Sequence, residues 1–269
     1  MDWTIEFDKA IEQYLPDLEV LQDEPMSRHT TFRIGGPAKR MAFPSSREQL
    51  VLLMSFAKNY GANPLVIGNG SNLLVPDEGL DRLVIDTSAN LNRVERGSGN
   101  TVLADAGATL ARTADLACKS GLTGLEFAHG IPGTLGGGVV MNAGAYGGEL
   151  KDVVTEVTAL YPDGVKVLTP AELDFSYRHS VFSAGEGIVL GAKLKLETGD
   201  KDAIKAEIRS WSGAVSTQSV NGASDLEYSY TTVLNGFSMK MPYGDIARAR
   251  ELDGVKRIFV AEQYSLPTT

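Results

Sequence analysis

Apolar and polar positions alternate along the chain in short stretches, each of a length typical of one helix or one strand. Residues 1–16 carry apolar side chains at helical spacing among acidic ones, which predicts a helix. Residues 28–36, RHTTFRIGG, place β-branched and aromatic residues before a Gly-Gly pair, which predicts a strand that enters a turn. A second helix follows Ser45 or Ser46, either of which can cap it, and Gly61 supplies its C-terminal stop.

Continuously apolar runs predict the next strands. PLVIG (64–68) and LVIDT (83–87) have the length of short strands, and TVLADAG (101–107) is another. Thr109 then caps a helix whose apolar residues share one face, and Gly121 ends that helix. Strands placed beside helices in this way predict mixed helix and strand content.

The clearest hairpin in the sequence is VVTEVTALYPDGVKVL, residues 153–168, with Asp163-Gly164 at the turn. GIVLGAKLKLE (187–197) alternates like a half-buried strand. Up to Glu197 the pattern therefore predicts an α+β chain of short strands with helices inserted between them.

The stretch from Gly124 to Leu150 is dense in glycine. Its glycines include Gly130, Gly133, Gly136, Gly137, Gly138, Gly144, Gly147 and Gly148. Glycine allows positive φ, and it lets a flat ligand or a phosphate come into contact with peptide N–H groups. An irregular loop that only connects two elements is the alternative interpretation.

A second loop favours the ligand interpretation. Gly68-Asn69-Gly70-Ser71-Asn72 directly follows an apolar run that predicts a buried strand. Such a turn presents successive N–H donors to an anion, and Ser and Asn side chains add more donors. Two such loops in one chain predict a ligand with a pyrophosphate and a large planar ring. Neither loop follows the G-x-G-x-x-G pattern of a Rossmann unit.

Composition narrows the class of protein. The 269 residues are 43% hydrophobic and 22% charged, which is typical of a globular chain. The net charge of −9 argues against a nucleic-acid or anionic-membrane surface, although a nucleotide can still bind locally. The single Cys118 excludes an internal disulfide, and His29, His129 and His179 lack metal-ligand spacing. With no signal-peptide pattern and no membrane-spanning apolar run, we expect a cytoplasmic protein.

Four motifs, in this order, make the chain similar to a known family. They are HTTFRIGGPA (29–38), the loop 68–74, GIPGTLGGGVVMNAGAYGGE (130–149) and FSYRHSVF (175–182). Four ordered motifs are far more specific than a lone glycine pattern. They resemble the bacterial UDP-N-acetylenolpyruvoylglucosamine reductases, FAD enzymes of peptidoglycan synthesis, over roughly the first three quarters of the chain.

The resemblance implies an architecture. We expect the two-subdomain FAD-binding fold of the vanillyl-alcohol oxidase type over residues 1–200, with subdomains of approximately 1–88 and 89–200. A helix and linker are expected over 201–224, and a β-α-β module over 225–269.

The resemblance also implies site residues. Arg178 is the expected catalytic residue, because a guanidinium stays protonated and can stabilise enolate charge on a substrate carboxylate. A surface arginine in a salt bridge is the alternative. Tyr177 is the expected substrate contact, and Tyr146 lies near the flavin or is only a packing aromatic. The expected FAD contacts are Gly68, Asn69, Gly70, Ser71, Asn72, Leu73, Ile131, Pro132, Gly133, Thr134, Gly136, Gly137, Asn142, Ala143, Gly144 and Tyr146.

The residues after Trp211 depart from the family's pattern. The family's third domain carries a serine that protonates the enolate and a late glutamate, and neither segment is found in this sequence. Residues 225–267 instead predict strand, helix and strand, and they resemble the C-terminal half of a subtilisin-type propeptide, an inhibitor module. A diverged piece of the reductase's own third domain is the alternative interpretation.

Three functions follow from these patterns. The first is NADPH-dependent reduction, through FAD, of the UDP-N-acetylglucosamine enolpyruvyl ether to UDP-N-acetylmuramate. The second is an FAD-binding fragment with impaired catalysis. The third is a tail module that binds a subtilisin-like protease by strand pairing. The expected partners are the UDP-sugar substrate and NADPH, with no nucleic acid and no membrane.

Overall fold

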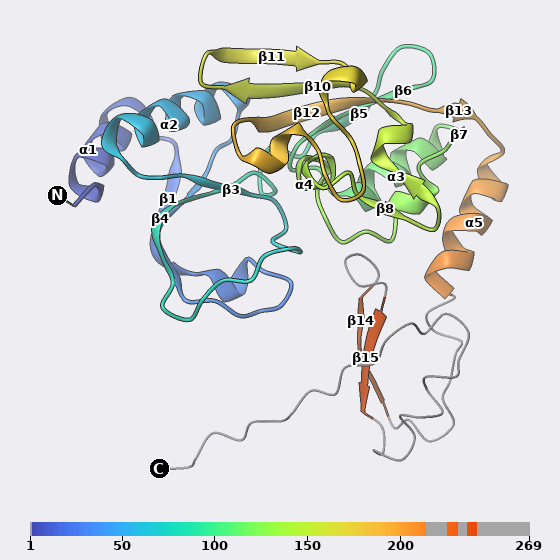
Figure 1. Cartoon of the computed structure of the whole chain (residues 1–269), viewed down its shortest axis with the longest axis horizontal. Coiled ribbons are helices and arrows are strands. Elements are labelled where there is room, and N and C mark those ends of the chain that lie inside the picture. Colours follow the sequence, from blue (N-terminus) through green and yellow to red (C-terminus); the bar gives the residue numbers. More distant parts are fainter. Residues whose placement is uncertain (1, 214–224, 231–235, 241–269) are drawn as a thin grey trace.

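The described chain forms two main β-sheets that lie side by side, each with helices packed on it (Figure 1). The computed structural model describes residues 2–213, 225–230 and 236–240. Within these residues, no helix is both long enough and apolar enough to cross a membrane.

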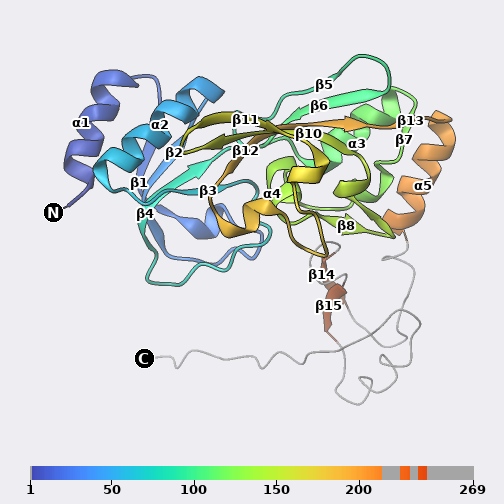
Figure 2. The same ribbon diagram turned by 45° about the horizontal axis from the view of Figure 1, so that its top comes forward.

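The first sheet has the strand order β1-β2-β4-β3. β1 and β2 pair antiparallel, whereas β4 is parallel to both β2 and β3. Helices α1 and α2 lie together on one side of this sheet (Figure 2). The elements are α1 (Thr4–Tyr14), β1 (Glu19–Pro25), β2 (Pro37–Phe43), α2 (Arg47–Tyr60), β3 (Leu65–Ile67) and β4 (Leu80–Asp86).

Both faces of the first sheet are covered, which explains the unbroken apolar run of β4. Leu83 and Ile85 join the cluster that includes α1 and α2, while Val84 joins Met26 and Met41 in a separate cluster. Successive residues of a strand point to opposite faces, so a strand covered on both faces is apolar throughout.

The helix predicted after Ser45 or Ser46 is confirmed, and Ser46 is the cap. Its Oγ accepts the Gln49 N–H at 3.1 Å, which satisfies one of the free donors at the start of α2. Gly61 has φ 71°, the left-handed conformation that ends a helix at glycine.

The strand predicted over residues 28–36 is wrong. The short 3-10 helix η1 (Met26–Arg28) and an irregular loop occupy this segment, and the strands β1 and β2 lie on either side of it. The Thr31 N–H donates to Gly70 O at 3.3 Å, and Arg33 has φ 55°. The segment therefore bonds to another loop, and its left-handed residue is incompatible with an extended ladder.

The second sheet is antiparallel throughout, with the order β11-β10-β12-β6-β5. The strands predicted at 101–107 and 187–197 are confirmed as β6 and β12. The main elements are β5 (Val94–Arg96), β6 (Thr101–Asp105), α3 (Leu110–Lys119), α4 (Leu135–Val140), β10 (Val154–Tyr161), β11 (Gly164–Leu168) and β12 (Ile188–Lys195). The shorter ones are β7 (Leu122–Thr123), η2 (Glu126–Ala128), β8 (Gly144–Ala145), β9 (Gly148–Glu149), η3 (Leu150–Asp152), η4 (Pro170–Glu172), η5 (Val181–Ala184) and β13 (Glu197–Thr198).

The hairpin predicted over residues 153–168 is confirmed as β10 and β11, but its turn lies one residue earlier than predicted. Tyr161 and Gly164 are the last paired residues, so Pro162 and Asp163 form the two-residue loop. Gly164 belongs to the ladder and has φ 126°, a conformation that favours glycine.

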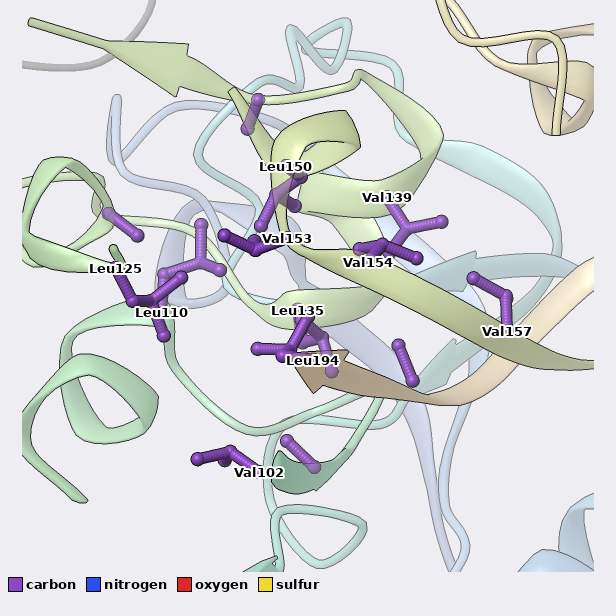
Figure 3. Packing of buried hydrophobic residues seen from close by; sticks show 14 of the residues in the cluster. Val102, Leu110, Leu125, Leu135, Val139, Leu150, Val153, Val154, Val157 and Leu194 are labelled. Carbon is purple, nitrogen blue, oxygen red and sulfur yellow. The ribbon is translucent and has the colours of Figure 1, made fainter. Parts of the chain in front are cut away.

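The glycine-dense stretch is more than a connecting loop, because it contains the buried helix α4. Leu135 and Val139 of this helix lie in the main cluster of the second sheet, together with Leu110 and Leu150 (Figure 3). Two glycines of α4 allow this close packing. A Cβ at Gly136 would lie 2.9 Å from the Ala106 Cβ, so any larger residue must displace the neighbouring segment.

A matched pair of glycine substitutions in α4 separates packing from helix propensity. Gly136→Ala is expected to lower the free energy of unfolding by about 1–3 kcal/mol, because its Cβ would overlap Ala106. Gly137→Ala should be neutral or stabilising by up to about 1 kcal/mol, since its nearest neighbour would be Thr134 Oγ1 at 3.7 Å. Urea unfolding of the FAD-free variants measures both; equal losses would contradict the packing assigned to Gly136.

The helix predicted within 201–224 is confirmed as α5 (Lys201–Gly213). After it, β14 (Asp225–Tyr230) and β15 (Gly236–Lys240) pair as an antiparallel hairpin, so two strands are found before the predicted helix of the tail, where one was predicted. The helix and the final strand predicted for residues 225–267 lie outside the described residues.

Candidate functional site

The two predicted ligand loops meet at the junction of the two sheets. The loop 68–74 follows β3 and reaches Thr134, the residue that precedes α4. Asn69 Nδ2 donates to Pro132 O at 3.3 Å. A Cβ placed on Gly68 would lie only 2.1 Å from Thr134 Oγ1, so the loops touch at a position where only glycine fits.

Backbone donors gather at this junction. Within the described part of the chain, the backbone N–H groups of Asn69, Gly70, Ser71 and Asn72 donate no hydrogen bond to another group, and neither does that of Gly133. Gly70 is buried. Buried peptide N–H groups are almost always paired in folded proteins, so the free N–H of Gly70 is typical of an anion site, and the neighbouring free donors extend that site along the loop.

Two of the glycines at the junction have no packing role among the described residues. A Cβ at Gly133 would meet Ser71 Oγ at 3.6 Å, and one at Gly137 would meet Thr134 Oγ1 at 3.7 Å. Both are ordinary contact distances, and neither glycine has positive φ. The space that a side chain would fill is therefore open beside the free N–H donors, which fits the close approach of a phosphate-bearing ligand.

A pocket of about 380 Å³ opens beside the junction. Its lining combines the predicted Gly68, Asn69 and Pro132 with residues that no prediction assigned to a site, namely Arg28, His29, Thr30, Thr31, Asp86 and Ser88. The place of the last two follows from the topology of the first sheet. β3 and β4 are parallel, so their C-terminal ends meet at one edge of the sheet, where ligands commonly bind.

Arg178 lies on a tight turn. Ser176 and His179 pair across this turn, and Arg178 has φ 56°. Its Nη2 donates to Gly144 O at 3.0 Å, which joins the turn to the glycine-dense stretch. The Tyr177 side chain is 82% exposed, and the Arg178 guanidinium lies 5.7 Å from the centre of its ring.

The charge of Arg178 has no ion-pair partner among the described residues. The salt bridges of this region instead join Glu149 to Lys151 and His179 to Asp174. The alternative of a surface arginine in a salt bridge therefore gains no support, and the guanidinium is available to an anionic ligand.

Asn142 connects the segments around Arg178. Its side chain is buried, with 1% of the residue exposed. Nδ2 donates to Glu149 Oε2 at 3.0 Å and to Ser176 O at 2.9 Å, and Oδ1 accepts the Lys151 N–H at 3.0 Å. Since both N–H groups are engaged within the chain, the carboxamide has no free donor for a cofactor.

The predicted site residues thus form two groups. The residues of 68–73 and 131–137 meet at the loop junction, and those of 142–146 meet Tyr177 and Arg178. The helix α4 joins the groups, and its six residues span about 9 Å. Tyr146 lies in the turn between β8 and β9, is 38% exposed and has φ 52°.

The ionisation of the Glu149 carboxyl makes the stability of the fold depend on pH. The ammonium group of Lys151, at 2.6 Å, holds the pKa of the Glu149 carboxyl below its usual range, and the hydrogen bond from Asn142 acts in the same direction. A lowered folded-state pKa means that the ionised carboxylate stabilises the fold above the pKa of the unfolded chain. This stabilisation is lost as the pH falls through the folded-state value.

Glu149→Gln is therefore expected to be less stable than the parent protein at pH 7, with a difference that shrinks as the pH is lowered toward 3. Thermal melts at a series of pH values measure the difference. Glu12→Gln is the control on the exposed face of α1, where the carboxylate forms no salt bridge among the described residues. A Glu149→Gln difference that stays constant with pH would contradict the assignment.

Each of the three histidines lies beside a carboxylate. His29, His129 and His179 each lie near a carboxylate, at 3.0, 3.3 and 3.3 Å respectively, and the described chain holds no cluster of three or more potential ligands. His29 is also part of the pocket lining.

Comparisons with known proteins agree on the class. A family model described as "FAD binding domain" matches residues 38–169. The reductase MurB from Thermus caldophilus superimposes with a TM-score of 0.61 and 30% identity, over 88% of this chain and 81% of that one. A cholesterol oxidase from Brevibacterium sterolicum has a TM-score of 0.53 at 18% identity, a likeness of fold alone. The fold and the site thus define an FAD-binding protein of the vanillyl-alcohol oxidase type, as predicted.

Curated relatives narrow the class to a family. The UDP-N-acetylenolpyruvoylglucosamine reductase of Limosilactobacillus reuteri is 48% identical over 194 residues, 72% of this chain and 64% of that protein. That of Agathobacter rectalis is 47% identical over 218 residues, 76% of this chain and 69% of that protein. The chain belongs to the UDP-N-acetylenolpyruvoylglucosamine reductase family, and it spans 64–69% of the length of these two relatives.

The C-terminal part matches a second family model, described as "Peptidase inhibitor I9", over residues 188–267. This agrees with the predicted likeness of the tail to a propeptide. The match begins inside the FAD-binding fold, because β12 pairs with β10 on one side and with β6 on the other.

Proposed function

We propose that the chain catalyses the NADPH-dependent reduction of the UDP-N-acetylglucosamine enolpyruvyl ether to UDP-N-acetylmuramate, as a cytoplasmic FAD enzyme of peptidoglycan precursor synthesis. One observation carries the proposal. Two glycine loops with free N–H donors face each other at one end of α4, and a guanidinium without an ion-pair partner lies near the other end. This arrangement suits a dinucleotide beside an anionic substrate.

The loop junction is the proposed site of the FAD pyrophosphate. The residues assigned to it are Gly68, Asn69, Gly70, Ser71, Asn72, Leu73, Ile131, Pro132, Gly133, Thr134, Gly136 and Gly137. Ala143, Gly144 and Tyr146 are assigned to the neighbourhood of the flavin ring. FAD, when bound, would supply the hydride chemistry that connects NADPH to the enolpyruvyl double bond.

Arg178 is the proposed catalytic residue. Hydride addition to the enolpyruvyl group leaves enolate charge on the substrate's carboxylate, and a guanidinium can stabilise that charge with two parallel N–H donors. Nη2 gives one of its two N–H groups to Gly144 O, so its second N–H still forms a parallel pair with an N–H of Nε or of Nη1 for the substrate. Tyr177, with its largely exposed side chain, is the proposed substrate contact.

Visible absorbance and NADPH oxidation test the proposal. Purified full-length chain reconstituted with FAD should be yellow, and it should oxidise NADPH only when the enolpyruvyl substrate is present. Gly137→Ala should unfold at the parent's temperature or higher yet bind FAD more weakly, because its Cβ enters the open space of the junction. Protein that stays colourless after reconstitution would refute the proposal.

A second candidate is an FAD-binding protein with impaired catalysis. The chain spans 64–69% of the length of the two relatives, and the family's serine and glutamate segments are not found. Loss of proton transfer and of charge stabilisation typically costs ~10²–10³-fold each. Bound FAD with turnover lowered by several powers of ten would favour this candidate, and turnover typical of the family would exclude it.

A third candidate rests on the tail, whose match to an inhibitor family favours contact with a subtilisin-like protease by strand pairing. The test is a titration of such a protease with the full chain. No inhibition at micromolar concentration would dispose of this candidate.

A further inference from the structure

Asn142 occupies a position from which it can control the placement of Arg178. It follows Met141, the C-cap of α4, and its buried carboxamide makes three hydrogen bonds to two segments: the stretch 149–151, through the Glu149 carboxylate and the Lys151 N–H, and the turn, through Ser176 O. The contact with Ser176 spans 34 residues of sequence. One side chain therefore ties the glycine-dense stretch to the turn that carries Arg178.

The segments joined by Asn142 hold strained backbone. Asn142, Tyr146, Asp174 and Arg178 have φ values of 40, 52, 47 and 56°, in the left-handed region. This conformation costs an L-residue about 1–2 kcal/mol, and it persists only where the surroundings impose it. Asparagine tolerates the left-handed conformation better than arginine does, so Asn142 is less strained than Arg178. The turn at Arg178 therefore requires support from outside itself.

Asn142 supports both sides of the contact that Arg178 makes. Arg178 Nη2 donates to Gly144 O, and Gly144 pairs with Glu149 across β8 and β9. Asn142 donates one N–H to Glu149 and the other to Ser176 O, two residues before Arg178. A shift of either segment would move the guanidinium relative to Gly144.

We propose that Asn142 is a positioning residue for Arg178, which holds the turn 176–179 against β8 and β9 and thereby fixes the guanidinium where the substrate carboxylate binds. The inference rests on the proposed function for its catalytic consequence. The structural part of the proposal, that Asn142 clamps the turn 176–179 against β8 and β9, depends only on the hydrogen bonds. Misplacing a catalytic group by about 1 Å can cost about 10²-fold in rate.

The variant Asn142→Asp tests the clamp with almost no change of volume. A carboxylate still accepts the Lys151 N–H, but it places oxygen against Ser176 O and Glu149 Oε2, where Asn142 donates two N–H groups. We expect substrate reduction to slow by about 10–100-fold.

A double-mutant cycle shows whether Asn142 acts through Arg178. In an Arg178→Ala background, Asn142→Asp should change substrate reduction by less than about twofold, because the group it positions is already gone. The control is Thr113→Val, which removes another buried hydrogen bond, from Thr113 Oγ1 to Thr109 O at 2.9 Å in α3. It should show the same small effect in both backgrounds. Equal losses for Asn142→Asp with and without Arg178 would overturn the proposal.

Hydrogen exchange gives a readout that does not depend on turnover. Amides of residues 174–180 should exchange at least about tenfold faster in Asn142→Asp and unchanged in Thr113→Val. Unchanged exchange in Asn142→Asp would overturn the proposal whether or not the protein is active. If the parent chain binds FAD but reduces no substrate, the proposed function fails, and the exchange result by itself decides whether the clamp exists.

Discussion

Arg178→Ala is expected to lower the rate of substrate reduction by about 10²–10³-fold, the usual effect of removing one group that stabilises transition-state charge. The guanidinium forms no salt bridge among the described residues, and the Glu149 carboxylate that interacts with its charge is itself paired with Lys151. Stopped-flow measurement should show the loss in substrate reduction and leave the bleaching of the flavin by NADPH near the parent's rate. Arg178→Lys should recover only part of the activity, because an ammonium lacks the planar pair of donors.

The matched control for Arg178 is Arg82→Ala. Arg82 is also half-buried and also donates to a backbone carbonyl, from Nε to Asn63 O at 2.9 Å, but it lies on β4. Removing the Arg82 side chain should change turnover by less than about twofold if the activity depends on the charge of Arg178 at its turn. Similar losses in the two alanine variants would show that general destabilisation, and not a role at the site, explains the effect of Arg178.

Gly70→Ala is expected to lower the free energy of unfolding by about 3 kcal/mol and to abolish FAD binding at micromolar cofactor. Gly70 has φ 58°, and an added Cβ would lie 2.0 Å from His29 O. Since the obstacle is backbone, the loop after β3 and the segment that carries His29 must separate. That movement would distort the row of free N–H donors at the junction.

Gly61→Ala supplies the control for Gly70. Gly61 has nearly the same conformation, φ 71°, but an added Cβ there would have nothing within 4 Å. The change should cost only the strain of a left-handed alanine, about 1 kcal/mol, and leave FAD binding intact. Urea unfolding and FAD titration measure the two variants side by side. Equal destabilisation would contradict the backbone clash assigned to Gly70.

Helices and strands whose sequence signals lie within a few residues of one another could be predicted from the sequence. The cap at Ser46 and the stop at Gly61 both lie within one turn of α2, and the apolar runs of β3 and β4 need no knowledge of their partners. The four motifs were also sufficient to predict the family. The domain boundaries and the roles of the site residues stay predictions.

Other elements could not be predicted from local pattern. β1 is only partly buried along its length, so its alternation is weak, and the segment around Arg33 has strand-like composition but bonds to a loop. α4 was not predicted, because its glycines matter only once Ala106 lies against them. The lining residues Asp86 and Ser88 came to light only with the parallel pairing of β3 and β4.

The sequence by itself determined the helix limits, most of the strands and the loops that present peptide donors, because these depend on neighbours within a few residues. Only the tertiary structure decided that the loops face each other and that Asn142 reaches the turn of Arg178. Those contacts join residues 63 and 34 positions apart, between Asn69 and Pro132 and between Asn142 and Ser176. Contacts of that separation depend on how the two sheets pack, and no local pattern encodes that packing.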